Sequence, residues 1–272
     1  MPRRGPHIKE LFDLTGRVAM VTGGAQNLGL DMAEALAEAG ADLVITSRLA
    51  EKAEAEAAEL QTYVPVKVLP MGLDVSDEGS VRRAFERVKE EYGRLDVLVC
   101  NAGGARLTGA GSSTDAMSVD DWDYVIRVNM RGAFLCCRAA LGLMKPQGSG
   151  SIVIIASMSG MIGRDRWVYE GSPDMIPNMT AYSAAKSGLI GFMRDLAAEN
   201  GKYGIRANCI SPGGFERGQP DDFIKRYNKQ TPLGRMGTDG KDLKGAVVYL
   251  ASDAAGYVTG HNLAVDGGFT AW

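Results

Sequence analysis

The chain has 272 residues, with 30 Lys and Arg against 33 Asp and Glu, and a formal net charge of −3 at pH 7. That balance excludes the dense basic field that non-specific binding to nucleic acid or to an anionic membrane surface usually requires. Glycine is frequent, at 35 residues, while 45% of the chain is hydrophobic, so the glycines indicate a folded protein with many tight turns and exclude a low-complexity or collagen-like chain.

Targeting segments and metal motifs are missing from the sequence. Residues 1–17 are basic but lack the apolar run of a signal peptide, and no later stretch approaches the roughly 20 apolar residues of a membrane span. We therefore expect a soluble, cytoplasmic protein. The cysteines lie in apolar runs without CxxC spacing, and the two histidines are far apart, so we expect buried, reduced thiols and no metal site. These residues are Cys100, Cys136, Cys137, Cys209, His7 and His261.

Short apolar runs of strand length alternate along the chain with segments of helical composition. The first run, 18–22, ends in glycines, as expected for a parallel strand buried on both faces, and a helix should follow at 28–39 and end at Gly40. Further strands are expected at 43–46, 66–69, 97–100, 152–156, 207–211 and 263–265, and helices at 50–60, 77–92, 122–144, 181–199 and 243–251. This order predicts an α/β fold: a single-domain, Rossmann-type, doubly wound parallel sheet of about seven strands with helices on both faces. The domain spans 1–272, with an N-terminal extension at 1–15.

A glycine-rich turn, Thr22–Gly29, joins the first strand to the first helix. Small residues there let the backbone approach a pyrophosphate, whose charge is met by the helix N-terminus. In such sheets the ligand binds beyond the carboxyl ends of the strands. The turn therefore predicts a dinucleotide site that includes Gly23, Asn27, Leu28 and Gly29; the alternative is a tight connection without a ligand.

The residues after the second strand bear on which nicotinamide cofactor is used. An acid there would accept hydrogen bonds from a ribose 2′-hydroxyl, whereas an arginine favours a 2′-phosphate. The sequence has Ser47 and Arg48 and no acid, which favours NADP(H) and leaves NAD(H) possible; the alternative is an arginine solvated at a helix start. Asp74, after the third strand, is expected either to accept a hydrogen bond from the adenine amino group or to stabilise a turn.

Tyr182 and Lys186 are four residues apart in a predicted helix, so their side chains share one face. A nearby ammonium stabilises a tyrosinate over the neutral phenol, which suits proton exchange with an alcohol or a carbonyl. Taken alone, this spacing is often coincidental. Ser157, however, follows the strand at 152–156, and the same edge of the sheet receives Asn101 after the fourth strand and Pro212–Gly213 after the sixth.

These motifs together resemble the short-chain dehydrogenase/reductase family, and the resemblance runs from Leu11 to Trp272. The matching segments are TGGAQNLG at 22–29, Asp74-Val75, Asn101-Ala102-Gly103, Asn129 in VIRVNMRGAF, Ser157, Tyr182 with Lys186, Ser211-Pro212-Gly213 and the tail SDAAGYVTGHNLAVDGG.

The resemblance implies a role for each catalytic residue. Tyr182 is the general acid or base, and Ser157 holds the substrate oxygen and stabilises developing alkoxide charge. Lys186 binds the nicotinamide ribose, and Asn129 anchors a water of a proton relay. The cofactor-binding set is Gly23, Asn27, Leu28, Gly29, Ser47, Arg48, Asp74, Val75, Asn101, Ala102, Gly103, Tyr182, Lys186, Pro212 and Gly213; no metal is needed.

Three features depart from the family pattern. Asn27 stands where the family usually has a glycine, and because Asn tolerates positive φ the turn is expected to survive. Arg217 replaces a threonine that touches the cofactor amide in many relatives, so that contact is not expected. The segment 160–180 makes the gap from Ser157 to Tyr182 longer than in most relatives. We expect it over the active-site mouth, as a substrate lid or subunit contact, or alternatively as a surface loop whose aromatics cover the core. Its candidate contact residues are Met161, Arg164, Arg166, Trp167, Tyr169, Met175 and Met179.

The tail VDGGFTAW and the Ser-Arg pair resemble the family branch that includes gluconate 5-dehydrogenases and related sugar or polyol dehydrogenases. That implies hydride transfer between NADP(H) and a secondary alcohol or ketone, with Arg164, Arg166 or Arg217 available for a substrate carboxylate. The apolar residues of 160–180 suit instead a hydrophobic cyclic ketone or a 3-oxoacyl chain.

A protein of a different functional class, a non-catalytic dinucleotide-binding regulator, would keep the fold and lose turnover. The family also implies a homotetramer, built through the helices after Asn129 and Tyr182 and the C-terminal strand.

Overall fold

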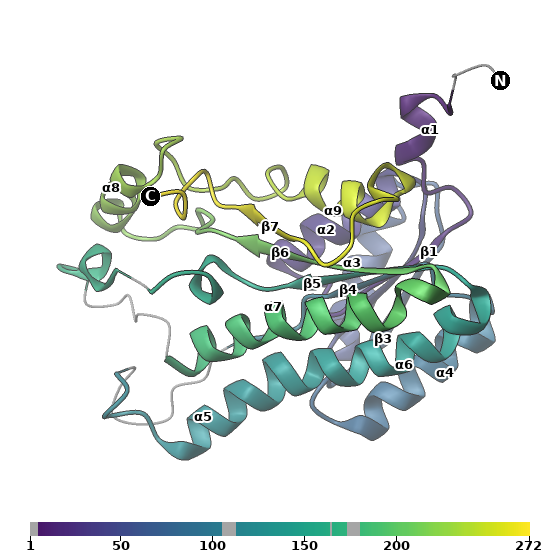
Figure 1. Cartoon of the computed structure of the whole chain (residues 1–272), viewed down its shortest axis with the longest axis horizontal. Coiled ribbons are helices and arrows are strands. Elements are labelled where there is room, and N and C mark those ends of the chain that lie inside the picture. Colours follow the sequence, from purple (N-terminus) through teal and green to yellow (C-terminus); the bar gives the residue numbers. More distant parts are fainter. Residues whose placement is uncertain (1–4, 105–112, 164, 173–179) are drawn as a thin grey trace.

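The computed structural model describes residues 5–104, 113–163, 165–172 and 180–272. Within these ranges seven parallel strands form one sheet in the order β3-β2-β1-β4-β5-β6-β7 (Figure 1). The strand order reverses between β1 and β4, which is where doubly wound sheets bind ligands. The strands are β1 (Val18–Val21), β2 (Asp42–Ser47), β3 (Val68–Gly72), β4 (Val97–Cys100), β5 (Gly150–Ile155), β6 (Ile205–Pro212) and β7 (Asn262–Val265).

Helices cover both faces of the sheet (Figure 1). One apolar core lies between the sheet and α4, α6 and α7, and a second lies between the sheet and α2, α3 and α9. The helices are α1 (Ile8–Phe12), α2 (Asn27–Glu38), α3 (Ala50–Leu60), α4 (Glu78–Tyr92), α5 (Val119–Ile126), α6 (Gly132–Gln147), α7 (Thr180–Asn200), α8 (Asp221–Gln230) and α9 (Lys244–Ala251). Across the described ranges, no helix combines the length and apolar composition that crossing a bilayer would need.

Strand β1 shows why the central strands are apolar throughout. Val18 and Met20 point into the first core, while Ala19 and Val21 point into the second. Successive side chains of a strand face opposite sides of the sheet, so a strand covered on both sides needs an apolar residue at every position. The predicted fold, a doubly wound parallel sheet, is confirmed.

Several element boundaries differ from the predictions. The third strand is 68–72 instead of 66–69, and it includes Pro70. Because β3 is the last strand on its side of the sheet, the missing N–H of Pro70 is tolerated there. The single helix predicted at 122–144 is in fact α5, a π-helical turn at Arg127–Arg131 and α6. Helices α1 and α8 were not predicted.

Candidate active site

A cleft of about 450 Å³ lies at the carboxyl ends of β1, β2 and β4. Ten of the residues lining it, Gln26 and Lys52 among them, were not predicted as cofactor contacts. Seven predicted cofactor residues line it: Gly23, Ser47, Arg48, Asp74, Val75, Ala102 and Gly103. The cleft therefore lies at the strand-order reversal, where the dinucleotide site was expected.

The glycine turn after β1 is held in one shape by close contacts. Gly23 has φ +64°, and Asn27, with φ 51°, is the single non-glycine residue of the described ranges with a positive φ, so this position does accept Asn as expected. The side-chain amide of Asn101 donates to the carbonyls of Thr22 and Gly23, at 3.0 and 3.1 Å. A Cβ on Gly29 would lie 2.1 Å from the Gly23 carbonyl oxygen. Helix α2 can therefore approach the turn this closely only with glycine at position 29.

Cationic and polar side chains gather where β2 meets α3. Arg48 and Lys52 both line the cleft, and Lys52 Nζ donates to the side-chain oxygen of Gln26 across it. Ser47 Oγ accepts the N–H of Leu49 at 3.3 Å. Asp74 is the one carboxylate among the described lining residues. Two cations beside a hydroxyl fit the phosphate of an adenosine 2′-phosphate, so the donor set agrees with an NADP(H) site.

Asp74 adopts the turn geometry that was the alternative reading of this residue. Its Oδ1 accepts hydrogen bonds from the N–H of Ser76 at 2.9 Å and from the Ser76 hydroxyl at 2.8 Å. The carboxylate nevertheless lines the cleft. Stabilising the turn and facing an adenine are therefore compatible for this side chain, because a carboxylate has several acceptor sites.

Lys186 is a buried cation in α7, with 4% of its surface exposed. Its Nζ donates to the carbonyl of Ile155, the last residue of β5, at 2.7 Å, and lies 5.4 Å from the centre of the Tyr182 ring. Burying an ammonium is unfavourable unless it is hydrogen-bonded, so the end of β5 fixes where this charge lies. The predicted pairing of Tyr182 with Lys186 is present.

Ser157 begins a short 3₁₀ turn, Met158–Gly160, directly after β5. Its Oγ accepts the N–H of Ser159 at 3.1 Å, and the residue is 8% exposed. A Cβ on Gly160 would lie 2.7 Å from the carbonyl carbon of Lys186, so the turn packs directly on the backbone of α7. The structure therefore brings the Ser157 turn against the helix that carries Tyr182 and Lys186.

Asn129 lies in the π-helical turn between α5 and α6 and is 2% exposed. Its Nδ2 donates to the carbonyls of Gly104 and Val125 at 2.7 and 2.9 Å, and its Oδ1 accepts the N–H of Gly104 at 3.2 Å. A Cβ on Gly103 would lie 2.5 Å from Asn129 Oδ1 and 3.5 Å from Lys186 Nζ. Asn129 and Lys186 therefore converge on the same glycine, and π-helical turns of this kind are frequent at functional sites.

The end of β6 carries two of the expected cofactor contacts, Pro212 and Gly213. Pro212 ends the strand, and the N–H of Gly213 donates to the Val265 carbonyl of the neighbouring strand at 2.9 Å. The guanidinium of Arg217 pairs with both carboxylate oxygens of Asp239, with Nη2 to Oδ1 at 2.7 Å. The suggestion that Arg217 holds a substrate carboxylate is therefore corrected. Its Nε and Nη2, the pair of donors that would bind a carboxylate, already bind Asp239.

The described part of the 160–180 segment docks on α8. Arg226 donates to the Val168 carbonyl at 3.0 Å and to Ser172 Oγ at 2.8 Å. Tyr169 is buried against Phe223, with ring centres 5.3 Å apart, whereas Trp167 is 68% exposed. Met161 and Arg166 are also exposed. The remaining candidate contacts of this segment, Arg164, Met175 and Met179, lie outside the described residues.

The four cysteines are free and buried, as predicted. Cys100 Sγ and Cys137 Sγ are 3.7 Å apart, and the hydrogen bond between them, together with burial, raises the pKa of Cys100 well above its usual value. Burial raises the pKa of Cys136 well above its usual value and that of Cys209 to about 12. Thiols in this state are poor nucleophiles and poor metal ligands, so they take no part in the candidate site.

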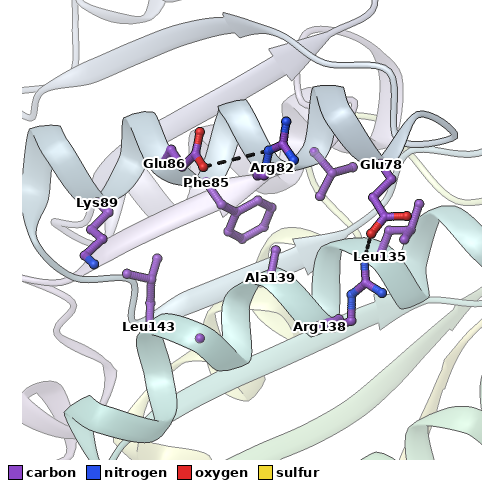
Figure 2. Close-up of a pocket in the computed structure, with 11 residues that line it drawn as sticks. Glu78, Arg82, Phe85, Glu86, Lys89, Leu135, Arg138, Ala139 and Leu143 are labelled. Carbon is purple, nitrogen blue, oxygen red and sulfur yellow. Dashed lines mark hydrogen bonds and ion pairs between the residues drawn. The ribbon is translucent and has the colours of Figure 1, made fainter.

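A second hollow lies away from the predicted residues. It is a groove of about 390 Å³ between α4 and α6, and none of the predicted site residues lines it. Figure 2 shows the Phe85 ring pointing from α4 toward Ala139 of α6, with the ion pairs Glu78–Arg138 and Arg82–Glu86 beside it. The lining of this groove combines apolar side chains such as Phe85 and Leu143 with charged ones at its edges, and it contains none of the motif residues.

A sequence model of the family described as enoyl-(acyl carrier protein) reductase matches residues 23–270. A crystal structure of a short-chain type dehydrogenase/reductase from Mycobacterium marinum is 32% identical, with a TM-score of 0.85, and the match covers 96% of this chain and 98% of that one. The chain belongs to the short-chain dehydrogenase/reductase family. It is an oxidoreductase, and the family resemblance stated from the motifs is confirmed.

Two further relatives of the enzyme have named activities. It is 38% identical to an NADP-dependent mannitol dehydrogenase of Hypocrea jecorina, over 99% of each chain. It is 34% identical to a gluconate 5-dehydrogenase of Burkholderia cenocepacia, whose crystal structure in complex with NADP and tartrate has a TM-score of 0.86 and a match covering 98% of this chain and 100% of that one.

Proposed function

We propose that the enzyme transfers a hydride between NADP(H) and the secondary alcohol or ketone of a sugar, sugar acid or polyol. The observation that carries this proposal is the Lys186 ammonium, held at the end of β5 beside the Tyr182 ring, on a helix whose backbone packs against the Ser157 turn. When bound, the nicotinamide supplies or accepts the hydride. The chain's own residues hold the substrate oxygen and move its proton.

The proposed catalytic roles are those that the family resemblance implies. Tyr182 exchanges a proton with the substrate oxygen, and the Lys186 ammonium beside its ring binds the nicotinamide ribose. Ser157 Oγ donates a hydrogen bond to the substrate oxygen and so stabilises developing alkoxide charge. Asn129 fixes Gly103 and Gly104 beside the lysine and anchors the water that links Lys186 to solvent; its two hydrogen bonds to Gly104 support this role.

The cleft beside these residues suits NADP(H) as the preferred cofactor, with NAD(H) as the weaker one. Ser47, Arg48 and Lys52 bind the 2′-phosphate, and the narrow turn around Gly29 receives the pyrophosphate. Asp74 faces the adenine, and Pro212–Gly213 borders the nicotinamide. The NADP named with the mannitol and gluconate dehydrogenases supports this choice.

The substrate class rests on the relatives with named activities. Mannitol and gluconate are both polyhydroxylated, and tartrate, bound in the second relative, is a hydroxy acid. The second candidate is a reductase of a hydrophobic cyclic ketone or a 3-oxoacyl chain. The exposed Trp167 and Met161 favour it, because they offer apolar surface in the segment that follows Ser157.

The assembly we propose is a cytoplasmic homotetramer of one domain per chain, residues 1–272, with segment 160–180 as a lid. Its contacts run through α6, α7 and β7. Phe134 of α6 is 44% exposed and lies edge-to-face with Phe192 of α7, with ring centres 6.2 Å apart. An exposed Phe134 packed on the partly buried Phe192 of the adjoining long helix supports a helix-to-helix contact between subunits.

The test is NADPH oxidation against D-fructose, L-sorbose, 5-ketogluconate, a cyclic ketone and a 3-oxoacyl thioester. We expect turnover with at least one polyhydroxylated ketone. The turnover rate of Tyr182→Phe should be lower by about 100-fold or more, while the variant still binds NADPH. Preference for the cyclic ketone or the thioester would favour the second candidate. If wild type and Tyr182→Phe both bind NADPH and are equally inert, the protein is a dinucleotide-binding regulator.

A further inference from the structure

Tyr227 of α8 bonds to the segments that follow two strands, β5 and β6. It is 1% exposed, and its hydroxyl accepts the N–H of Gly214 and donates to Met158 Sδ at 3.4 Å. Gly214 comes two residues after the end of β6, and Met158 directly follows Ser157 after β5. One hydroxyl therefore connects the serine turn with the backbone next to the proposed nicotinamide contact, Gly213.

The ring of Tyr227 leaves these backbones little freedom. A Cβ on Gly214 would lie 2.8 Å from its Cζ, and a Cβ on Gly213 would lie 3.2 Å from its hydroxyl oxygen. On the other side the ring stacks on Phe269, with centres 4.8 Å apart. The phenol is thus fixed from several directions, so its two hydrogen bonds have a defined geometry.

The same helix also holds the segment that follows Ser157. Arg226, the neighbour of Tyr227, binds the Val168 carbonyl and Ser172 Oγ. Gln230, one turn further, binds the carboxylate of Asp165. Helix α8 is therefore attached at once to the docked segment 165–172 and, through Tyr227, to the ends of β5 and β6.

We propose that Tyr227 is a positioning residue for hydride transfer. Its hydroxyl holds the Gly213–Gly214 backbone at a set distance from Met158, and thereby holds the surface that receives the nicotinamide at a set distance from Ser157, which holds the substrate oxygen. Rates of such transfers fall by up to about 100-fold when the reacting groups are misplaced by an ångström. The assignment rests on the proposed function, since it presumes that Ser157 and Gly213 flank the reacting atoms.

Tyr227→Phe removes the hydroxyl and keeps the stacked ring. We expect turnover to fall about tenfold, as for the loss of one buried hydrogen bond, and the primary deuterium isotope effect measured with 4-deuterated NADPH to increase. The fluorescence of enzyme-bound NADPH should change, because it reports the surroundings of the nicotinamide. Affinity for 2′,5′-ADP should stay within about twofold of wild type, because that half of the cofactor lies in the cleft of Arg48 and Lys52, away from Tyr227.

Two control variants separate positioning from general stability. Tyr63→Phe removes a phenol hydroxyl that donates to Glu34 at 2.9 Å, after the end of α3, and should leave the isotope effect and the bound-NADPH fluorescence unchanged. Leu60→Ala removes buried volume from the end of α3, a helix that packs on β2 and β3, and it should lower the unfolding temperature. If Leu60→Ala alters both readouts as Tyr227→Phe does, or if Tyr227→Phe alters neither, the proposal is wrong.

Met158→Leu keeps the side-chain volume and removes the sulfur acceptor, so it decides the question should Tyr227→Phe fail to fold. It should raise the isotope effect and alter the fluorescence in the same direction, and wild-type values of both would overturn the proposal. A wild-type enzyme that binds NADPH but turns over no substrate would refute the proposed function instead. In that case the bound-NADPH fluorescence of the two variants still tests whether Tyr227 sets the nicotinamide surface.

Discussion

Lys186 Nζ lies 5.4 Å from the centre of the Tyr182 ring while it donates a 2.7 Å hydrogen bond to the Ile155 carbonyl. The two residues share one face of α7, but the sheet fixes the ammonium, because Ile155 is the last residue of β5. The ammonium beside the phenol is therefore held by the same strand end that leads into Ser157. An ammonium fixed in this way needs no rearrangement to serve the proposed reaction.

Lys186→Met should lower kcat by about 100-fold or more, because it removes the cation that lies beside the Tyr182 ring and that is proposed to bind the nicotinamide ribose. NADPH oxidation at saturating substrate measures this loss. The matched control is Lys202→Met, which removes an ammonium 5.2 Å from the Tyr203 ring in a surface turn and should keep the wild-type kcat. A wild-type kcat in Lys186→Met would contradict the role given to the lysine.

Gly29→Ala should weaken NADPH binding by more than about tenfold. Its Cβ would lie 2.1 Å from the Gly23 carbonyl oxygen and 2.5 Å from Asn101 Nδ2, so the turn or the helix must move. Gly245→Ala in α9 is the control, because nothing lies within 4 Å of its added Cβ, and it should raise helix stability slightly. Titration of bound-NADPH fluorescence checks both variants, and unchanged affinity in Gly29→Ala would contradict the close approach of α2 to the turn.

Lys52→Gln should raise the dissociation constant for NADPH by about tenfold and leave that for NADH unchanged, because only NADPH carries the 2′-phosphate. Arg48→Gln should also weaken NADPH binding and spare NADH binding. In the wild-type enzyme, the difference between the dissociation constants for NADPH and NADH should become smaller as salt increases. Lys225→Gln, which removes an exposed lysine of α8 paired with Asp222, is the control. Equal losses of NADPH and NADH affinity would show that these cations bind another part of the cofactor.

The fold could be predicted because its signals are local. Strands covered on both faces are apolar at every position, as in Val18–Val21, and each intervening helix buries one stripe. The predicted third strand ended at residue 69, whereas β3 continues through Pro70 to Gly72. A proline is excluded from a central strand but accepted in an edge strand, and the sequence alone does not show which strand lies at the edge. Helix α8 did carry a signal, since Phe223 and Tyr227 are its buried pair at i and i+4.

The candidate site was predicted where motifs mark it and missed where side chains meet across segments. Gln26 and Lys52 come from a turn and a helix start that are neighbours only in the folded sheet. In the π-helical turn, the Asn129 amide binds Gly104, a contact 25 positions away. Arg217 looked available for substrate because its partner, Asp239, lies 22 positions further on. Pairings of this kind require tertiary structure.

Asp31→Asn should raise the unfolding temperature at pH 7.5. The carboxyl is buried in α2, and burial raises its pKa above the usual 3.8, with the nearby Asp239 adding to the effect and the Gly240 backbone opposing it. A raised folded-state pKa means that the folded protein binds this proton more tightly than the unfolded chain does. The ionised Asp31 therefore lowers stability above that pKa, and the penalty disappears as pH falls through the raised pKa toward 3.8. The gain in unfolding temperature from Asp31→Asn should accordingly be largest at neutral pH and shrink on acidification, in thermal unfolding followed from pH 7.5 downward.

The control is Asp195→Asn, at an exposed carboxylate of α7, which should show no such trend. A variant less stable than wild type at pH 7.5 would mean that the contacts of the carboxylate, through the Gly240 backbone and Arg217, outweigh the cost of its burial.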